Sequence, residues 1–488
     1  MRDISSAHRR PRSLALLAAA ALLASCGSTA PDAPPAVAAP GAAAVWVTSG
    51  DHTRLLARGD DIAFDAAPAA ALHIEVDVQR RYQTMAGFGA SLTDSSAWLI
   101  ARLPAAQRKA LLEELFGRGP GGIGLEVARL TIGASDFSRQ HYSLDDRPAG
   151  ESDPTLANFS IDANRADVLP VIREALAVNP ALKVMASPWS APGWMKTSGS
   201  LVQGSLRPDM HDAFARYLVR YVQAYAAEGV PIFALTVQNE PHFEPPDYPG
   251  MRIDPPARAA LIGRHLGPLL RAQGLATQIL EWDHNWDDPQ APLTVLADPV
   301  ASSYISGVAW HCYAGDVRSQ STVHDAHPDK DVWFTECSGG EWNREWPQAL
   351  PWYASHIVIG ASREWARGVL MWNFALDEKF GPHLGGCSNC RGVVTIDSAT
   401  GAVTRNLEYY ALAHASKFVR PGAQRIGSTG AVGELDNVAF RNADDGSRVL
   451  VVSNAATQAR QFSVNEGGRR FRFSIPAGSL ATFTWPER

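Results

Sequence analysis

The sequence predicts an α/β protein in which a (β/α)8 TIM barrel carries a side β-sandwich domain formed by N-terminal and C-terminal strands. Eight short apolar runs alternate with longer amphipathic segments between about residues 84 and 420. Strands of alternating polarity follow in 421–488, and similar strands precede in 45–83. An open doubly wound sheet is the alternative, but no GxGxxG follows the first apolar run and no Walker motif is present.

The predicted barrel strands are apolar almost throughout, as strands buried on both faces must be. In order they read AGFGASLT, LEVARLTIG, LKVMAS, IFALTVQ, TQILEW, SGVAWHCY, DVWFTE and GVLMWNF. Amphipathic segments lie between or after them, including AAQRKALLEELF, ADVLPVIREALAV, MHDAFARYLVRYVQAYAAEG, PPARAALIGRHLGPLLRAQG and TRNLEYYALAHASKFV. Eight strand–helix pairs in this order favour a barrel with its active site at the carboxyl ends of the strands.

The flanking segments predict the side domain. In 421–488 the runs VAFRN, RVLVVSN, QFSVN, FRFSI and ATFTW are separated by the turn signals DDGS and EGGR. Before the barrel, the run LHIEVDV alternates in polarity as a half-buried strand does. We therefore expect the strands in 45–83 to complete the sandwich formed by 421–488.

The first 44 residues predict export. Arg9, Arg10 and Arg12 precede an apolar run at 14–24 that is too short to span a bilayer, which indicates a signal peptide over 1–25. The sequence LASC ends at Cys26 and resembles a bacterial lipobox, so Cys26 is the expected lipidation site and 26–44 a Pro/Ala-rich tether. The alternative is an ordinary signal peptide cleaved later, within AVAAPGAAA. The expected location is the periplasmic or surface face of the outer membrane, through the lipid anchor alone, or otherwise the periplasm or the medium.

Four further cysteines fit an oxidising compartment. Cys387 and Cys390 lie in GGCSNCRG between turn signals, without the strand-to-helix context of a redox CxxC or the second pair of a zinc site. We expect a local disulfide there. Cys312 and Cys337 each follow an apolar run and are expected to be free, small buried residues.

Composition narrows the classes of partner. The formal net charge of −6 supplies no basic field for phosphates, so nucleic acid is not an expected partner. The chain has 14 tryptophans, which either fill a core or stack against the apolar faces of sugar rings. Histidines occur in WDHN and WHCY without HExxH or an equivalent ligand motif, so no metal site and no cofactor are expected.

Polar and aromatic residues stand where the predicted barrel strands end. Two of these ends carry a glutamate after an apolar run: Glu240 in ALTVQNEP and Glu336 in VWFTECSGG. Pro241 is expected to hold Glu240 in an extended conformation, with Asn239 beside it to bind a substrate hydroxyl. The other strand ends contribute Asp94, Arg129, Asp136, Trp189, the WDHN motif, His311, Tyr313 and Trp372. Two rim glutamates with nearby tryptophans and no metal-binding motif predict glycoside hydrolysis.

The order of these motifs resembles glycoside hydrolase family 30, the group that includes the glucosylceramidases. The resemblance rests on GFGASLTDSSA, RLTIGASDFS, SPWSAPGWMKT, TVQNEP, AWHCYAG, FTECSGG and MWNFAL, and covers nearly the whole chain after the tether. It implies that Glu240 is the acid/base and Glu336 the nucleophile. It also implies that the −1 sugar is held by Asp136, Trp189, Asn239 and Trp372, and that the nucleophile is supported by Arg129, His311 and Tyr313, with Asp94 carried over as a further binding residue. The GASLTDSS and GGCSNCRG stretches depart from the pattern of the animal enzymes. The resemblance therefore extends to the chemistry and not to the aglycone site.

The resemblance implies retaining hydrolysis of β-glucosidic bonds, with a glucosylceramidase-like activity as the first expectation and endo-β-1,6-glucanase as the alternative. Inverting hydrolysis is the alternative chemistry, and it needs the two carboxyl groups roughly 6.5–9.5 Å apart instead of about 5–5.5 Å. For retention, Glu240 is expected to be protonated and Glu336 ionised. Trp282, Trp286, Trp342 and Trp346 are candidate platforms for further sugars. The alternative from another class is a non-catalytic, lipid-anchored sugar-binding protein.

Overall fold

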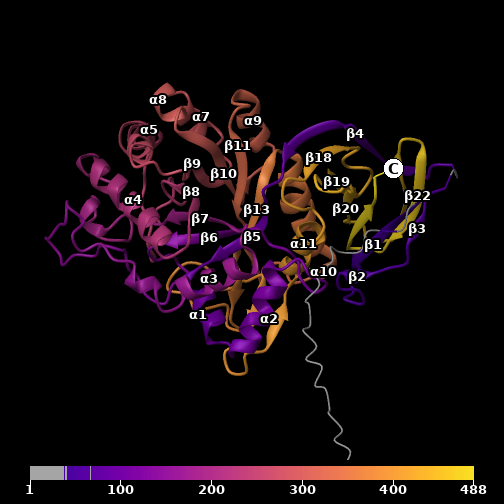
Figure 1. The fold of residues 1–488 in the computed structure, drawn as a ribbon, viewed down its shortest axis with the longest axis horizontal. Helices are drawn as coiled ribbons and strands as arrows, with labels where there is room; N and C mark the ends of the chain where they lie inside the picture. The colour runs from indigo at the N-terminus through magenta and orange to yellow at the C-terminus, as the bar shows by residue number, and fades with distance from the viewer. Residues whose placement is uncertain (1–37, 39–40, 66–67, 488) are drawn as a thin grey trace, which may run out of the picture.

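The computed structural model describes residue 38, residues 41–65 and residues 68–487. A closed parallel barrel stands beside a ten-stranded β-domain, as predicted (Figure 1). The predicted signal peptide 1–25, Cys26 and most of the predicted tether lie outside the described residues. Within them, no helix combines the length and apolar character needed to cross a bilayer.

The barrel contains all eight predicted strands in sequence order, each paired in parallel with its neighbours. They are β5 (Gly87–Leu92), β6 (Val127–Ile132), β7 (Lys183–Pro188), β8 (Ile232–Thr236), β9 (Gln278–Trp286), β10 (Ile305–Gly315), β11 (Asp331–Glu336) and β13 (Ala366–Asn373). Parallel pairing places all eight carboxyl ends at one rim, so residues far apart in the sequence meet there.

Helices cover the outside of the barrel (Figure 1). They are α1 (Asp94–Arg102), α2 (Ala105–Phe116), α3 (Val168–Val178), α4 (His211–Ala227), α5 (Pro255–Leu261), α6 (Gly267–Ala272), α7 (Gln290–Leu296), α8 (Pro299–Ser302), α9 (Ser319–Ala326), α10 (Trp346–Tyr353) and α11 (Leu407–Ser416). The predicted helix over 255–274 is interrupted between α5 and α6 by a π-helical segment, Ile262–Leu266. Pro268 follows it and has no N–H to donate to the preceding turn, which accounts for the widened turn. A second π-helical segment, Ala354–Ala361, directly follows α10, which contains Pro351.

The side domain combines strands from both ends of the described chain. Its strands are β1 (Ala42–Thr48), β2 (Ala57–Arg58), β3 (Ile62–Ala63), β4 (Leu72–Thr84), β18 (Gln424–Ser428), β19 (Leu435–Arg441), β20 (Arg448–Asn454), β21 (Arg460–Glu466), β22 (Arg469–Ile475) and β23 (Ser479–Trp485). β1 pairs with β23, whereas β4 pairs with β18 on one side and β21 on the other. The N-terminal strands therefore complete the sandwich, although β1 begins at Ala42, inside the predicted tether.

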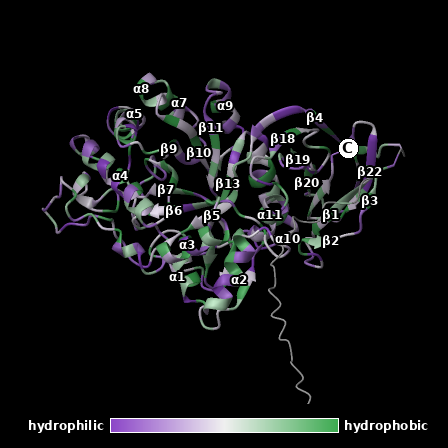
Figure 2. Ribbon diagram, viewed as in Figure 1, coloured by the Kyte–Doolittle hydropathy of each residue, from purple (hydrophilic) through white to green (hydrophobic). Residues whose placement is uncertain are grey.

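β4 also connects the two parts of the molecule. Its first half packs Ile74 and Val76 into the sandwich core, and its second half, with exposed Arg80 and Arg81, runs as a largely hydrophilic arc toward the barrel (Figure 2). The chain enters the first barrel strand three residues after β4 ends.

Two apolar layers lie directly below and around the rim. One fills the lower lumen and consists of Ala86, Val127, Met185, Ala234, Leu280, Ala309, Trp333 and Leu370. We call it the lower lumen layer. The other is a small cluster at the rim that includes Phe137, Trp189 and Trp372. Short pairs of strands extend the rim, namely β12 (Gly339–Gly340) with β15 (Cys390–Arg391), and β14 (Ala375–Leu376) with β16 (Val394–Ile396), which also pairs with β17 (Val403–Arg405).

Candidate active site

A cavity of about 600 Å³ opens at the carboxyl ends of the barrel strands. Seven of the predicted site residues line it, namely Asp136, Trp189, Asn239, Glu240, Tyr313, Glu336 and Trp372. Its wall also contains Phe243, Tyr248, His284, Asn285, Trp342, Cys387 and Cys390. The structure therefore brings together most of the residues that the sequence analysis singled out.

Glu336 ends β11 and is held by two donors. Arg129 of β6 donates from Nη1 to Glu336 Oε2 at 2.6 Å, and the Tyr313 hydroxyl donates to Glu336 Oε1 at 3.0 Å. Arg129 is 1% exposed, and its guanidinium lies 4.9 Å from the Trp189 ring centroid. These contacts fix the direction of the Glu336 carboxylate toward the cavity.

Glu240 lies opposite and is held by His311. The His311 Nδ1–H donates to Glu240 Oε1 at 3.2 Å, and the same nitrogen lies 3.9 Å from Glu336 Oε1. A carboxylate oxygen of Glu240 and one of Glu336 lie within 4.8 Å of each other. This short spacing fits the separation of about 5–5.5 Å typical of retaining glycosidases rather than the 6.5–9.5 Å of inverting ones.

The backbone at Glu240 differs from the prediction. Glu240 has φ of +49°, in the left-handed region, and not the extended conformation expected from Pro241. Its N–H donates to the Asp283 carbonyl at 3.0 Å, and its carbonyl accepts from Phe243 N–H at 2.9 Å. The tight turn made by these bonds overrides the preference of a residue before proline and turns the side chain toward His311.

Asp283 organises the floor of the cavity and was not identified from the sequence. Its fully buried carboxylate accepts hydrogen bonds from five strands at 2.7–3.0 Å, from Arg129, Ser187, Thr236, His311 and Thr335. Because Arg129 also binds Glu336 and His311 also binds Glu240, Asp283 is the common partner of the two groups that hold the glutamates. The WDHN motif marks this strand end, but nothing in it distinguishes Asp283 from its neighbours.

The buried charges determine where protons lie in the free site. Burial alone would raise the pKa of Asp283, but Arg129 and His311 keep it far below its ordinary value. Burial opposes a charged His311, yet Glu336, Asp283 and Glu240 raise the pKa of its imidazole to about 9. The floor therefore holds two cations, Arg129 and His311, facing the Asp283 carboxylate and the glutamate pair.

The proton of the glutamate pair is distributed differently from the expectation. Burial would raise the pKa of Glu240, but the hydrogen bond from His311 and the nearby His284 outweigh it and lower that pKa. Burial raises the pKa of Glu336, and His311 and Arg129 offset only part of this. The free site thus favours an ionised Glu240, whereas retaining hydrolysis begins with the proton on Glu240 and the charge on Glu336.

One wall of the cavity combines aromatic rings with a buried carboxyl group. The rings of Trp189 and Trp372 are stacked with centroids 5.1 Å apart. Asp136 stands beside them, and burial together with Glu336 and Glu240 raises its pKa well above the usual value. Gly386 has φ of +65° and approaches so closely that an added Cβ would lie 2.5 Å from Asp136 Cβ. This lets the loop that carries Cys387 and Cys390 close against the wall.

The four cysteines within the described residues form two disulfides, of which one was predicted. Cys387 and Cys390 are bonded, as expected, and line the cavity. Cys312 and Cys337 are also bonded, so the prediction that they are free was wrong. They lie at the ends of the adjacent strands β10 and β11 with Cα atoms 5.4 Å apart, a proximity that separate apolar runs in the sequence do not reveal.

Asp94 and three of the candidate tryptophans lie outside the cavity. Asp94 is the first residue of α1, and its carboxylate accepts from Arg139 Nε and Nη2, each at 2.8 Å. Trp282 and Trp286 are buried at 2% and 3% exposure, and Trp346 packs against His52 and Tyr410. Trp342, by contrast, is 55% exposed and lines the cavity.

One group of described residues has the spacing of metal ligands, namely Glu240, His311 and Glu336. His311 Nδ1 and the Glu240 and Glu336 oxygens already bind one another or Arg129 and Tyr313. The Arg129 guanidinium and the charged imidazole would repel a cation placed among them. The arrangement therefore suits a charged hydrogen-bond network for acid–base chemistry better than a metal site.

Sequence models of two domains match the chain. The glycosyl hydrolase family 30 TIM-barrel domain matches residues 85–419, and the glycosyl hydrolase family 30 beta-sandwich domain matches residues 422–483. Together they cover the barrel and the C-terminal strands of the side domain.

Curated relatives agree with the domain matches. An endo-1,6-beta-D-glucanase of Neurospora crassa is 40% identical over 77% of this chain and 79% of its own length. The lysosomal acid glucosylceramidase of Mus musculus is 28% identical over 85% of this chain and 83% of its own length. A solved endo-beta1,6-glucanase structure has a TM-score of 0.84 at 33% identity and covers 92% of this chain and 100% of its own. The chain is therefore a glycosidase that belongs to glycoside hydrolase family 30.

Proposed function

We propose that this glycosidase hydrolyses β-1,6-linked glucan by double displacement with retention. The single observation that carries the mechanism is the pair of Glu240 and Glu336, whose oxygens lie within 4.8 Å of each other at the floor of one cavity. Glu336 attacks the anomeric carbon while Glu240 protonates the leaving oxygen. Glu240 then takes a proton from water, which hydrolyses the glycosyl-enzyme.

The first step requires the pair's proton to be on Glu240. Arg129 and Tyr313 both donate to Glu336, so these contacts stabilise its carboxylate form when the proton moves across the short gap. His311 bonds both Asp283 and Glu240 and can stabilise the Glu240 carboxylate that remains after the leaving group departs. The same network thus serves both protonation states of the pair.

The choice of substrate rests on relatives and on the mouth of the cavity. Relatives of 33–40% identity are endo-1,6-beta-glucanases, whereas the relatives named glucosylceramidases are 27–30% identical. The exposed Trp342 and Phe243 at the cavity offer aromatic surfaces against which further sugar rings can stack. These two observations support β-1,6-glucan over glucosylceramide as the proposed substrate, the reverse of the order expected from the sequence.

Parallel assays on a linear β-1,6-glucan, a glucosylceramide in detergent and an aryl β-glucoside test the proposal. The glucan should be cleaved fastest, its early products should be a ladder of oligosaccharides, and proton NMR should show the β-anomer first. Cleavage of glucosylceramide alone would contradict the substrate assignment, and initial release of the α-anomer would contradict retention.

A pair of tryptophan variants sharpens the substrate test. Trp342→Ala should lower kcat/KM on the glucan by roughly tenfold while changing the aryl glucoside little, because only the longer substrate reaches beyond the reacting sugar. Trp352→Ala is the matched control, since Trp352 is 37% exposed but lies on α10 and does not line the cavity. Equal losses of kcat/KM in the two variants would show that Trp342 does not contribute to binding the glucan.

We also propose that the enzyme is exported and anchored through Cys26, a reading supported by the LASC sequence after a short apolar run. Cys26→Ala should move the protein from the membrane fraction to the soluble fraction after lysis, with its specific activity unchanged. Recovery of the wild-type protein in the soluble fraction without detergent would contradict the anchor.

A further inference from the structure

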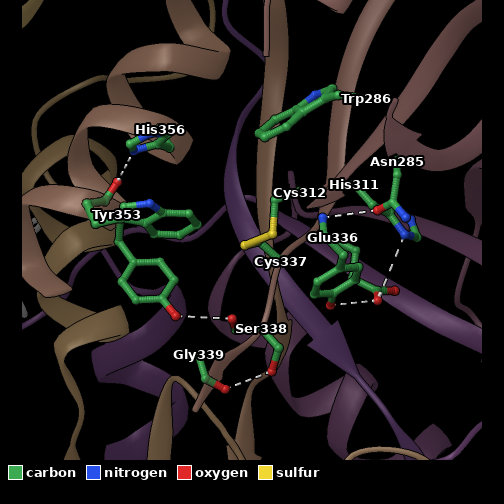
Figure 3. The surroundings of a disulfide bond; sticks show 12 residues. Asn285, Trp286, His311, Cys312, Glu336, Cys337, Ser338, Gly339, Tyr353 and His356 are labelled. Atoms are coloured by element: carbon green, nitrogen blue, oxygen red, sulfur yellow. Dashed lines mark hydrogen bonds and ion pairs between the residues drawn. A yellow bond between two sulfur atoms is a disulfide. The ribbon is translucent and has the colours of Figure 1, made fainter. Parts of the chain in front are cut away.

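The disulfide between Cys312 and Cys337 joins the two strand ends that carry the catalytic network. Cys312 stands between His311, which binds Glu240, and Tyr313, which binds Glu336. Cys337 directly follows Glu336. In Figure 3 the disulfide lies beside His311 and Glu336. The disulfide therefore connects the residue between His311 and Tyr313, which hold the two glutamates, to the residue that follows Glu336.

This bond lies where the strand pairing becomes irregular. Trp310 pairs with Phe334, but the next pair joins His311 to Glu336, so Thr335 is skipped. On the other side of β10, the pairing with β9 shifts again between His311 and Gly315. Regular backbone pairing thus holds the strands only up to the level of the glutamates, and the side chains above it need another constraint.

The disulfide lies behind the site and does not line the cavity. Cys337 is 1% exposed and belongs to the main apolar core, against which Cys312 also packs. The Cys337 carbonyl accepts a hydrogen bond from Trp372 N–H at 2.9 Å, which ties the same point to the aromatic wall. A group in this position cannot touch substrate, but it can set the distance between β10 and β11.

We propose that the Cys312–Cys337 disulfide is a positioning crosslink that holds Tyr313 and His311 in register with Glu336 and so sets the turnover rate. The proposal rests on the roles assigned to Glu240 and Glu336 above. If the crosslink opens, the Tyr313 hydroxyl and Glu336 are free to separate. A displacement of about 1 Å in such a site lowers turnover by up to roughly 100-fold.

A variant with one remaining disulfide isolates the effect. Cys387→Ser/Cys390→Ser keeps the Cys312–Cys337 bond, so its oxidised and reduced forms can be compared with each other. Dithiothreitol supplies two electrons and two protons, the S–S bond becomes two thiols, and the reagent becomes its cyclic disulfide. We expect kcat on an aryl β-glucoside to fall by roughly 10- to 100-fold on reduction and to return on reoxidation, with KM changed less.

The pH profile separates positioning from a purely structural role. Loss of the Tyr313 hydrogen bond should raise the pKa of Glu336 in the reduced form, which moves the acid limb of kcat/KM to higher pH. A disulfide that only stabilised the fold would lower the melting temperature and leave kcat and this limb unchanged below it. Two titrated thiols with an unchanged kcat and acid limb would overturn the proposal.

A second pair of variants gives the same test without a reductant. Cys312→Ala/Cys337→Ala should show the same fall in kcat and shift of the acid limb, and should no longer respond to dithiothreitol in the background that lacks the other disulfide. Unchanged kcat in this double variant would also overturn the proposal. The proposed function fails separately, if the wild-type protein is inactive or Glu336→Ala keeps its activity.

Discussion

Two layers of side chains in the barrel lumen, two residues apart along the same strands, have opposite polarity. The lower lumen layer is apolar, with Val127, Met185, Ala234, Ala309 and Trp333 among its members. Two positions further along the same five strands stand Arg129, Ser187, Thr236, His311 and Thr335, and every one of them donates to Asp283. Since side chains two apart on a strand share a face, one set of strands builds an apolar plug and, on top of it, a charged floor.

The difference shows how the barrel separates stability from chemistry. The apolar layer excludes water beneath the floor, so each charge above it acts in a medium of low polarity. The Asp283 carboxylate offsets the charges of Arg129 and His311 in this floor, and it accepts a hydrogen bond from each of the five strands. Mutations in the two layers should therefore have different consequences, and three predictions test this contrast.

The largest effect is expected above the floor, at the two glutamates. Glu336→Ala should abolish turnover of every substrate, because no glycosyl-enzyme forms. Glu240→Ala should keep the first step on aryl glycosides with acidic phenols, which need little protonation, and so show a burst. Natural substrates should lose roughly 10²–10⁴-fold.

Azide distinguishes the two glutamate variants. It needs no deprotonation, so it should restore turnover in Glu240→Ala and give a β-glycosyl azide, whereas Glu336→Ala can give only the α-product. Identical behaviour of the two variants, or exchanged behaviour, would contradict the assigned roles.

A matched pair of substitutions compares the layers directly. Asp283→Asn should cost about 3–5 kcal/mol of stability, because it leaves Arg129 and His311 without their shared anion, and should lower kcat by roughly 100-fold through misplacement of both glutamates. Leu280→Ala in the lower lumen layer should cost a similar 2–5 kcal/mol while leaving kcat nearly unchanged. Urea unfolding and assays well below both melting temperatures measure the two effects. A loss of kcat in Leu280→Ala together with an unchanged kcat in Asp283→Asn would contradict the expected difference between the two layers.

A smaller effect is expected on the pH dependence of stability. His311 has a pKa of about 9 in the folded protein, above its ordinary value of 6.5. Its contribution, on the order of 3 kcal/mol, is therefore complete below about pH 6.5 and is lost as pH rises through about 9. The free energy of unfolding should fall over this range in the wild-type protein and fall less in His311→Gln. Equal slopes would show that the imidazole is not charged in the floor.

The contrast between the layers also explains what the sequence could predict. Apolar runs identified all eight barrel strands, and the residues ending them included seven that line the cavity. Asp283 was missed because β9 has an extra residue there: Ala309 of β10 pairs with Trp282 and Trp310 with His284, which leaves Asp283 unpaired. Trp282 and Asp283 have φ of +74° and +56°, so the alternation changes phase and turns Asp283 inward. Such a bulge has no signature in a run of apolar letters.

The proton distribution between Glu240 and Glu336 and the Cys312–Cys337 disulfide could not be predicted from the sequence, for a related reason. Both depend on distances between residues of neighbouring strands, such as the 3.2 Å from His311 to Glu240 and the 5.4 Å between the Cα atoms of Cys312 and Cys337. The motif order identifies which residues reach the rim, but not which of them touch.

The pairing of β1 with β23 and of β4 with β18 and β21 has a consequence for biogenesis. Strands made first on the ribosome must wait for partners made last, with the entire barrel synthesised in between. The sandwich is therefore the last part to close, and β1 and β4 remain open edges until then. A chain that stalls or is clipped before β18 would carry a barrel beside two strands, β1 and β4, whose C-terminal partner strands are missing, a form that quality-control proteases and chaperones can recognise.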